Sequence, residues 1–333
     1  MHDPASPAST TDLDYGLHSA FLSKLDDGQK LRIFDLTTRA SRELHRWVVR
    51  YPLIRRVRVW PLCLSVAAAA PFASAAALTT MARMNLWVFT IDDLFDEEIV
   101  PVAELRRRVE QYHNILAGAR IDTRRERDTL VLALQDIRDD LRSYPLFSAL
   151  QDHWADAVSG TLGAMLREHE WRVRYQAEHD QMQWPSYESY LSHGLYSVGG
   201  PPHIWTSLIA IGDESVLQHL QRIKDLERAA SICIRLANDL RSYTKEVGEG
   251  KINSVVIRQH EAIARGVDHQ TALDQACAAV EHDIQRHLAR CTELQYQDRT
   301  ATGQPEQAIA DIARFVCDFY VNHDYHTFMA ARS

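Results

Sequence analysis

Apolar residues recur along most of the chain at every third or fourth position, which is the spacing of a helix buried along one face. We find no series of alternating strands joined by hairpin turns. Only 13 glycines and 11 prolines interrupt 333 residues, so long helices with short connections are expected. The pattern predicts helices over residues 27–50, 61–80, 82–98, 102–118, 123–142, 147–178, 186–198, 203–210, 214–247, 253–263, 269–296 and 305–330.

Breaks in this pattern indicate where the predicted helices end and how the chain is organised into domains. Pro101 fits the first turn of a new helix. The run from Gly199 to Pro202 interrupts a helical region, because its prolines remove donors and its glycines relax the backbone. No internal repeat or low-complexity linker divides the chain. We therefore predict a disordered tail over residues 1–12 and one all-α domain over residues 13–333.

Composition narrows the class of protein. A hydrophobic content of 46% is enough for a large core, and a net charge of −8 argues against a nucleic-acid partner. The five cysteines are dispersed and contain no CxxC, as in reduced cytoplasmic proteins. The most apolar run, Val66 to Leu78, is shorter than the ~20 residues that span a bilayer. We expect a cytoplasmic protein without stable membrane insertion.

An acidic cluster closes the helix predicted over residues 82–98. Asp92 and Asp96 are four positions apart and share a helix face, with Asp93 about 100° away around the same turn. Val88 and Phe89 continue this stripe on its apolar side, as the wall of a cavity would. Like charges so close together disfavour a helix unless a cation lies beside them. The alternative is a solvated helix end, although an acidic end opposes the helix dipole.

A second polar stripe lies about 150 positions later. Asn238, Ser242 and Glu246 are spaced at i, i+4 and i+8, so three oxygen ligands share one helix face, and Arg235 and Lys245 add positive charge to it. Asn and Ser are weak helix formers, and here both fall within a helix. Oxygen ligands from two helices suit Mg²⁺ sharing its shell with a phosphate. The alternative is a polar face with chance spacing.

In their order and separation, the two motifs resemble those of class I terpene synthases. The resemblance implies a single helical bundle around a central apolar cavity, a prenyl diphosphate substrate, possible pairing into a homodimer, and a cluster of about three Mg²⁺ ions. It also implies ionisation of the diphosphate and cyclisation of the resulting carbocation. The metal ligands implied are Asp92, Asp93, Asp96, Asn238, Ser242 and Glu246. Of these, Asp92, Asn238, Ser242 and Glu246 are the catalytic set, and Arg235 and Lys245 would bind diphosphate.

Two short strings are similar to bacterial ent-kaurene-type, or labdane-related, diterpene synthases. They are the run from Ser186 to Trp205 and the run from Arg235 to Leu240. This likeness implies a C20 substrate, either geranylgeranyl or copalyl-type diphosphate.

The chain also departs from the family pattern in two places. Many bacterial relatives carry a diphosphate-sensing arginine where this chain has His193 and Gly194, so Arg235 is expected to take that role. The Arg-Tyr pair that often ends the fold is missing, since Asp324 precedes Tyr325. The C-terminal groups that touch diphosphate are left open.

A set of residues near the motifs is expected to line the cavity, where apolar and aromatic groups would shield or stabilise a cation. Taken singly, each aromatic is equally a packing residue. The set is Trp87, Val88, Phe89, Tyr196, Ser197, Gly199 and Trp205.

Three other functions are weighed against this one. A sesquiterpene synthase would use the same motifs on farnesyl diphosphate. A linear prenyltransferase would carry two aspartate-rich motifs, whereas this chain has an Asn/Ser/Glu face. A non-catalytic helical protein would show no magnesium-dependent stabilisation by diphosphate.

Overall fold

A computed structural model describes residues 19–96, 100–122, 124–178 and 184–325, apart from the side chains of residues 175–178. The tail expected over residues 1–12 lies outside this part, as do Glu97, Glu98 and His326. The described residues form α-helices and short 3-10 helices, without β-strands, and their buried apolar side chains make one contiguous core. The all-α prediction is confirmed.

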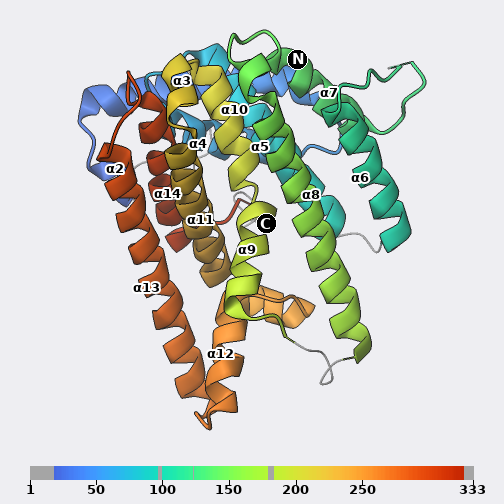
Figure 1. The fold of residues 1–333 in the computed structure, drawn as a ribbon, viewed down its shortest axis with the longest axis vertical. Helices are drawn as coiled ribbons and strands as arrows, with labels where there is room; N and C mark the ends of the chain where they lie inside the picture. The colour runs from blue at the N-terminus through green and yellow to red at the C-terminus, as the bar shows by residue number, and fades with distance from the viewer. Residues whose placement is uncertain (1–18, 97–99, 123, 179–183, 326–333) are drawn as a thin grey trace, which may run out of the picture.

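The helices follow one another with short connections (Figure 1). In chain order they are α2 (Ala20–Ser23), α3 (Asp27–Val48), η1 (Arg56–Arg58), α4 (Val59–Ala69), α5 (Ala75–Asp96), α6 (Val102–Leu116), α7 (Thr129–Leu141), α8 (Phe147–Glu178), α9 (Tyr187–Ser197), α10 (Gly200–Ile211), η3 (Glu214–Gln218), α11 (Leu220–Glu249), α12 (Ser254–Ala264), α13 (His269–Tyr296) and α14 (Gln304–Asn322).

The central helices are apolar on nearly every side. In α4 and α10 almost all residues are buried, and in α5 most are, as expected for helices surrounded by other helices. The outer helix α3 buries only one face, and Asp26 and Gln29 begin it with a reciprocal capping box. In Figure 1 the long helices α8 and α13 flank α9 and α11, and α11 packs against both α13 and α14. This arrangement places the polar half of α11 opposite the end of α5.

Several of the predicted helix boundaries are wrong. The break between the second and third helices lies at residues 70–74 instead of residue 81, because Pro71 lacks an N–H and the Ser74 hydroxyl then accepts from Ala77 to begin α5. The break near residue 200 is shorter than expected. Pro201 and Pro202 lie in the first turn of α10, where backbone N–H groups have no partner within the helix anyway.

The last predicted helix ends earlier than expected. Asn322 is the final residue of α14, and the His323 N–H closes its last turn on the Phe319 carbonyl. Residues 323–325 continue beyond the helix. Among the described residues, no helix is both long enough and apolar enough to cross a bilayer.

Candidate active site

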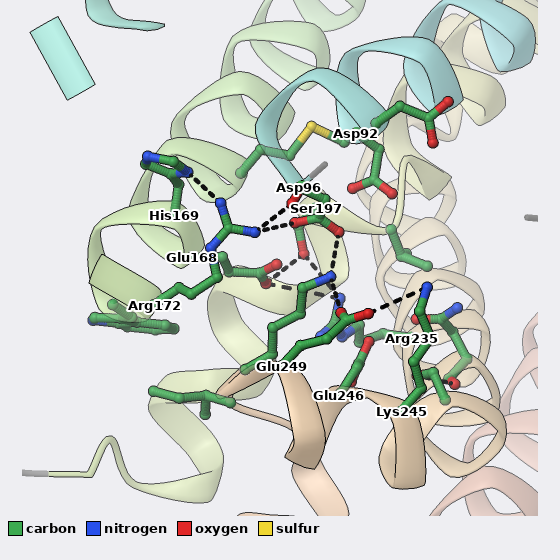
Figure 2. A pocket seen from close by; sticks show the side chains of 18 of the residues that line it. Asp92, Asp96, Glu168, His169, Arg172, Ser197, Arg235, Lys245, Glu246 and Glu249 are labelled. Carbon is green, nitrogen blue, oxygen red and sulfur yellow. Dashed lines mark hydrogen bonds and ion pairs between the residues drawn. The ribbon is translucent and has the colours of Figure 1, made fainter. Parts of the chain in front are cut away.

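A cavity of about 680 Å³ lies between α5, α8, α11 and the segment after α14. It contains residues from both predicted motifs, although these are far apart in sequence (Figure 2). The predicted site residues that line it are Val88, Phe89, Asp92, Asp93, Asp96, Ser197, Arg235, Asn238, Ser242, Lys245 and Glu246. The structure thus brings the two motifs to one pocket.

Helix α5 forms one wall of the pocket, and this wall has an apolar part and an acidic part. Val88 and Phe89 give it an apolar part, and Asp92 and Asp96 follow one turn and two turns later on the same face. Asp92 is half-buried and Asp96, the last residue of α5, is exposed. The wall therefore changes from apolar inside the pocket to acidic at its rim.

Basic side chains of the protein itself contact the acidic end of α5. The Arg58 guanidinium pairs with both oxygens of Asp93, at 2.6 and 2.8 Å. The Lys251 ammonium lies 2.8 Å from an Asp96 oxygen. Arg172 donates to the backbone carbonyls of Phe95 and Asp96, so it caps the negative end of the helix dipole. These cations account for how a helix tolerates several adjacent carboxylates.

Asp93 differs from the other two aspartates. Its side chain is 10% exposed, and Arg55 adds a second ion pair to the one with Arg58. Both of its carboxylate oxygens accept from Arg58, and the side chain also lines the pocket, so its place among the metal ligands stays a prediction.

Helix α11 presents its oxygen ligands on the facing side of the pocket. Asn238, Ser242 and Glu246 all line the cavity, as their spacing predicts. The Ser242 hydroxyl donates to the Asn238 carbonyl at 2.8 Å, and a Glu246 oxygen accepts from the Asn253 amide at 2.6 Å. Asp239, which falls between them in sequence, is fully buried and accepts from Tyr190 beside Arg235. The polar stripe is therefore a pocket face of α11 and not a solvated one.

Arg235 lies beneath this stripe, 7% exposed. Its guanidinium is 2.8 Å from an Asp239 oxygen and donates to the Ser197 hydroxyl at 3.3 Å. Burial would lower the pKa of Arg235, but Asp239 and Glu168 outweigh it and hold the pKa well above the usual value. Gly194 gives the side chain room to pass, since a Cβ there would lie 3.2 Å from the Arg235 Cγ.

The pocket also holds charged residues that the sequence analysis missed. Lys251 follows Gly250, which ends α11 in the left-handed conformation and turns the chain back, so that the lysine bridges Asp96 and Glu249. Burial would lower the pKa of Lys251, but Asp96 and Glu249 raise it, so the ammonium stays charged. Lys245 is more exposed and pairs with Glu249 at 3.6 Å. In the sequence, the glycine that ends α11 was the feature that could have indicated a turn of the chain at Lys251.

Helix α8 adds a further group that was missed. Glu168 accepts from the Ser197 hydroxyl at 2.6 Å and lies 3.8 Å from Arg235. Burial raises the pKa of its carboxyl, although Arg235 and Ser197 oppose the shift. His169 and Arg172 are one turn apart on the same helix, and both reach the end of α5. In the sequence, the signal for these side chains is the occurrence of Glu168, His169 and Arg172 within about one turn of the same helix.

Two of the residues expected in the cavity lie elsewhere. The buried Trp87 donates its indole N–H to the Leu130 carbonyl and packs edge-on against Tyr112, away from the pocket. Trp205 stacks on His153 and donates to Glu227 at 3.2 Å. Each indole N–H thus has a partner in the core, which a position on an apolar cavity wall would not provide.

Tyr196 and Gly199 also lie outside the lining. The Tyr196 ring packs against Gly160, because that glycine has no side chain in its way. Gly199 adopts a φ of +76° and is in close contact with Val88, which does line the pocket. Gly199 therefore supports the cavity wall from behind, whereas its neighbours Ser197 and Val198 are part of that wall.

Residues 83–286 match the family model described as terpene synthase family 2, C-terminal metal binding. The chain belongs to this family. The matched range contains both motifs of the pocket, and this terpene synthase region is described as metal-binding. Within the described ranges, no three His, Cys, Asp or Glu side chains converge on a metal position. The pocket instead combines aspartates with amide, hydroxyl and glutamate oxygens from a second helix.

Curated relatives are similar over parts of their length. Dolabradiene synthase of Zea mays is 27% identical over 253 residues, which cover 71% of this chain and 27% of the relative. Pristinol synthase of Streptomyces pristinaespiralis is 27% identical over 232 residues, which cover 63% of this chain and 56% of the relative. The alignments thus span less than two thirds of either relative.

Solved structures of terpene synthases share the fold. A hedycaryol synthase superimposes with a TM-score of 0.62 at 21% identity, covering 87% of this chain and 93% of that one. Linalool/nerolidol synthase from Streptomyces clavuligerus, in complex with 2-fluorogeranyl diphosphate, gives 0.65 at 17% identity, covering 86% and 94%. The likeness confirms the helical terpene synthase fold.

Proposed function

We propose that this protein is a magnesium-dependent class I terpene synthase that ionises a C20 prenyl diphosphate and cyclises the resulting carbocation to a diterpene. One observation carries the proposal. Asp92 and Asp96 of α5 and Asn238, Ser242 and Glu246 of α11 line one pocket, whose α5 wall becomes apolar on the inside. A metal-dependent reaction on a molecule with a charged head and a hydrocarbon tail needs this combination.

The donor groups fit Mg²⁺. They are carboxylate, amide and hydroxyl oxygens, the hard ligands that this ion prefers, and no thiolate or imidazole is among them. We assign Asp92 and Asp96 as one ligand group, with Asp93 in support, and Asn238, Ser242 and Glu246 as the other. When bound, the ions stabilise the negative charge that develops on the leaving diphosphate. A cluster of about three ions suits two ligand groups and a bridging diphosphate.

Basic side chains around the pocket hold the diphosphate and balance its charge. Arg235 and Lys245 are the predicted pair, one buried and one at the rim. We add Lys251, whose ammonium is already at the mouth. Fixed cations placed where charge develops lower the barrier to carbon–oxygen cleavage. Arg235 also donates to Ser197, which places a charged group beside the break between α9 and α10.

The inner part of the pocket shields the carbocation. Its apolar and aromatic lining excludes water, which would otherwise capture the cation before the rings close. Phe89, Trp171 and Tyr320 offer aromatic faces that stabilise positive charge. The other apolar lining residues are Val88, Val100, Met165, Val173, Val198 and Ile252.

A C20 substrate is favoured by the two short strings that are similar to ent-kaurene-type synthases. Curated relatives include ent-kaurene synthase-like 3 of Oryza sativa subsp. japonica, 33% identical over 97 residues. We therefore expect geranylgeranyl or copalyl-type diphosphate to be turned over in preference to farnesyl diphosphate.

A substrate panel tests the proposal. The purified chain is incubated with Mg²⁺ and each of farnesyl, geranylgeranyl and copalyl diphosphates, and hydrocarbon products are identified by mass spectrometry. Cyclic C20 products support the proposal, and C15 products alone replace the diterpene assignment with a sesquiterpene one. Elongated linear products from added isopentenyl diphosphate would indicate a prenyltransferase. No product with any substrate, in enzyme that remains folded, would contradict the proposal.

A further inference from the structure

A buried arginine outside the pocket connects the acidic end of α5 to the segment that follows α14. Arg58 is 1% exposed, lies at the start of α4 and does not line the cavity. Its guanidinium holds both Asp93 oxygens and donates to the carbonyls of Phe89 and Tyr325, at 3.1 and 3.2 Å. Burying a guanidinium costs free energy unless its N–H donors have partners. Here the partners belong to α5 and to the segment after α14, which are far apart in sequence.

The segment after α14 is held by α4 at a second point. The Tyr325 hydroxyl is 2.5 Å from that of Ser65, two turns along α4 from Arg58. The Tyr325 ring stacks on Phe319 with centroids 4.1 Å apart, and it also contacts Phe89. Tyr325 is therefore an anchor, buried on all sides and 2% exposed.

This anchor places neighbouring residues in the pocket wall. Tyr320 and Asp324 both line the cavity, and they flank the point where the chain leaves α14. Their positions depend on where Tyr325 is fixed, because only residues 323 and 324 separate it from the helix. The contacts of Arg58 thus hold the C-terminal side of the pocket as well as the Asp93 carboxylate in place.

We propose that Arg58 is a positioning residue that couples the C-terminal wall of the pocket to the acidic end of α5. It holds both Asp93 oxygens in an ion pair and fixes the segment His323–Tyr325 through the Tyr325 carbonyl. The consequence for the reaction rests on the proposed function. With the wall loosened, water adds to the first carbocation, a carbon–oxygen bond forms and a proton is lost to solvent. The product is then an alcohol with the uncyclised skeleton of the substrate.

The test removes both charges of the pair. Arg58→Met alone removes the buried partner of the Asp93 carboxylate and leaves the more exposed Arg55 beside it, which risks unfolding, so it is combined with Asp93→Asn. The matched control is Arg56→Met, an exposed arginine two residues earlier. Hydrogen–deuterium exchange is followed at the amides of residues 319–325, and the share of uncyclised alcohol is measured with the best substrate of the panel.

In the double variant we expect amide exchange at residues 319–325 to rise by roughly tenfold or more, because local opening becomes easier once a buried charged contact is lost. The share of uncyclised alcohol should rise at least about threefold as water gains access. The control should change neither measurement. Unchanged exchange in a folded double variant would overturn the coupling. If the wild-type chain turns over no diphosphate, the proposed function fails, and the exchange measurement still decides the role of Arg58.

Discussion

At the scale of single residues, the pocket combines carboxylates with nearby cations of the protein. Asp96 lies against Lys251, and Asp93 against Arg58 and Arg55. Each pair places a cation of the protein within a few ångströms of a carboxylate that belongs to the acidic cluster. Any metal ion that enters at Asp96 therefore competes with a lysine.

The assignment of metal ligands predicts that Asp92→Ala and Asn238→Ala each lower turnover by roughly 100-fold or more, because each removes an oxygen that stabilises the developing charge. Circular dichroism should show an intact fold, since both side chains lie at the pocket and not in the core. The control is Asp274→Asn, which alters an exposed aspartate on α13. Wild-type rates in both alanine variants would refute the site assignment.

A second prediction concerns Glu227, which accepts from Trp205 and is 9% exposed. Burial raises the pKa of its carboxyl from 4.5 to about 7, although Trp205 opposes the shift. Between these pH values the folded chain holds a proton that the unfolded chain has released, so the free energy of unfolding falls as pH rises through the window.

Glu227→Gln should therefore stabilise the protein above pH 7 by about 1–3 kcal/mol, since the amide removes the cost of a buried charge. At pH 5 its effect should be small. Urea unfolding at pH 5 and pH 8.5 measures both values. Equal effects at the two pH values would show that the carboxyl titrates normally in the folded protein.

At the scale of elements, hydrophobic periodicity predicted most helices within a few residues, because amphipathic helices such as α3 bury one face. It failed where helices are apolar on every side. The run from α4 into α5 is apolar on most sides, so its periodicity does not show where one helix ends and the next begins. The break at Pro71 was therefore placed ten residues too late. The beginning of α10 at Gly200 was missed as well, because prolines in the first turn of a helix look in the sequence like a break between two helices.

The break between α9 and α10 leads to a third prediction. Gly199→Ala should lower the free energy of unfolding by about 1–3 kcal/mol, because φ is +76° and a Cβ would collide with Val88. Gly163→Ala is a matched control within α8, where nothing lies near the added methyl. That variant should be unchanged or more stable by about 0.5–1 kcal/mol. Chemical denaturation measures both, and similar stabilities would remove the proposed constraint on the pocket wall.

At the scale of the whole molecule, the sequence indicated both ligand groups but not the residues that accompany them. Asp92 and Asn238 belong to spaced patterns within single helices, and such patterns can be seen without coordinates. Lys251 and Glu168 enter the site from a loop and from a facing helix, and Arg58 contacts Asp93 from outside the pocket, at the start of α4. Their neighbours are set by tertiary packing, which local spacing does not encode. The predictions for Trp87, Tyr196 and Trp205 failed for the same reason, since burial alone does not decide whether a ring faces a cavity or the core, whereas Phe89 lines the pocket as predicted.

The pocket predicts a stabilisation that needs two ligands together. Mg²⁺ with inorganic pyrophosphate should raise the free energy of unfolding by about 2.7 kcal/mol at concentrations 100-fold above the dissociation constant, because only the folded chain brings the ligand groups together. A thermal-shift experiment compares both ligands with each alone. Asn238→Ala should abolish the shift. An equal shift in that variant would indicate binding elsewhere on the protein.

The lysine between Asp96 and Glu249 has one more consequence. Because this ammonium offsets part of the negative charge at the rim, an arriving divalent ion is attracted less strongly there, and it must displace the side chain to reach the Asp96 oxygen. The displaced ammonium can then pair with the pyrophosphate that binds next. Metal and anion should accordingly bind with positive cooperativity, each weak by itself, so that the apparent magnesium requirement falls as pyrophosphate is added.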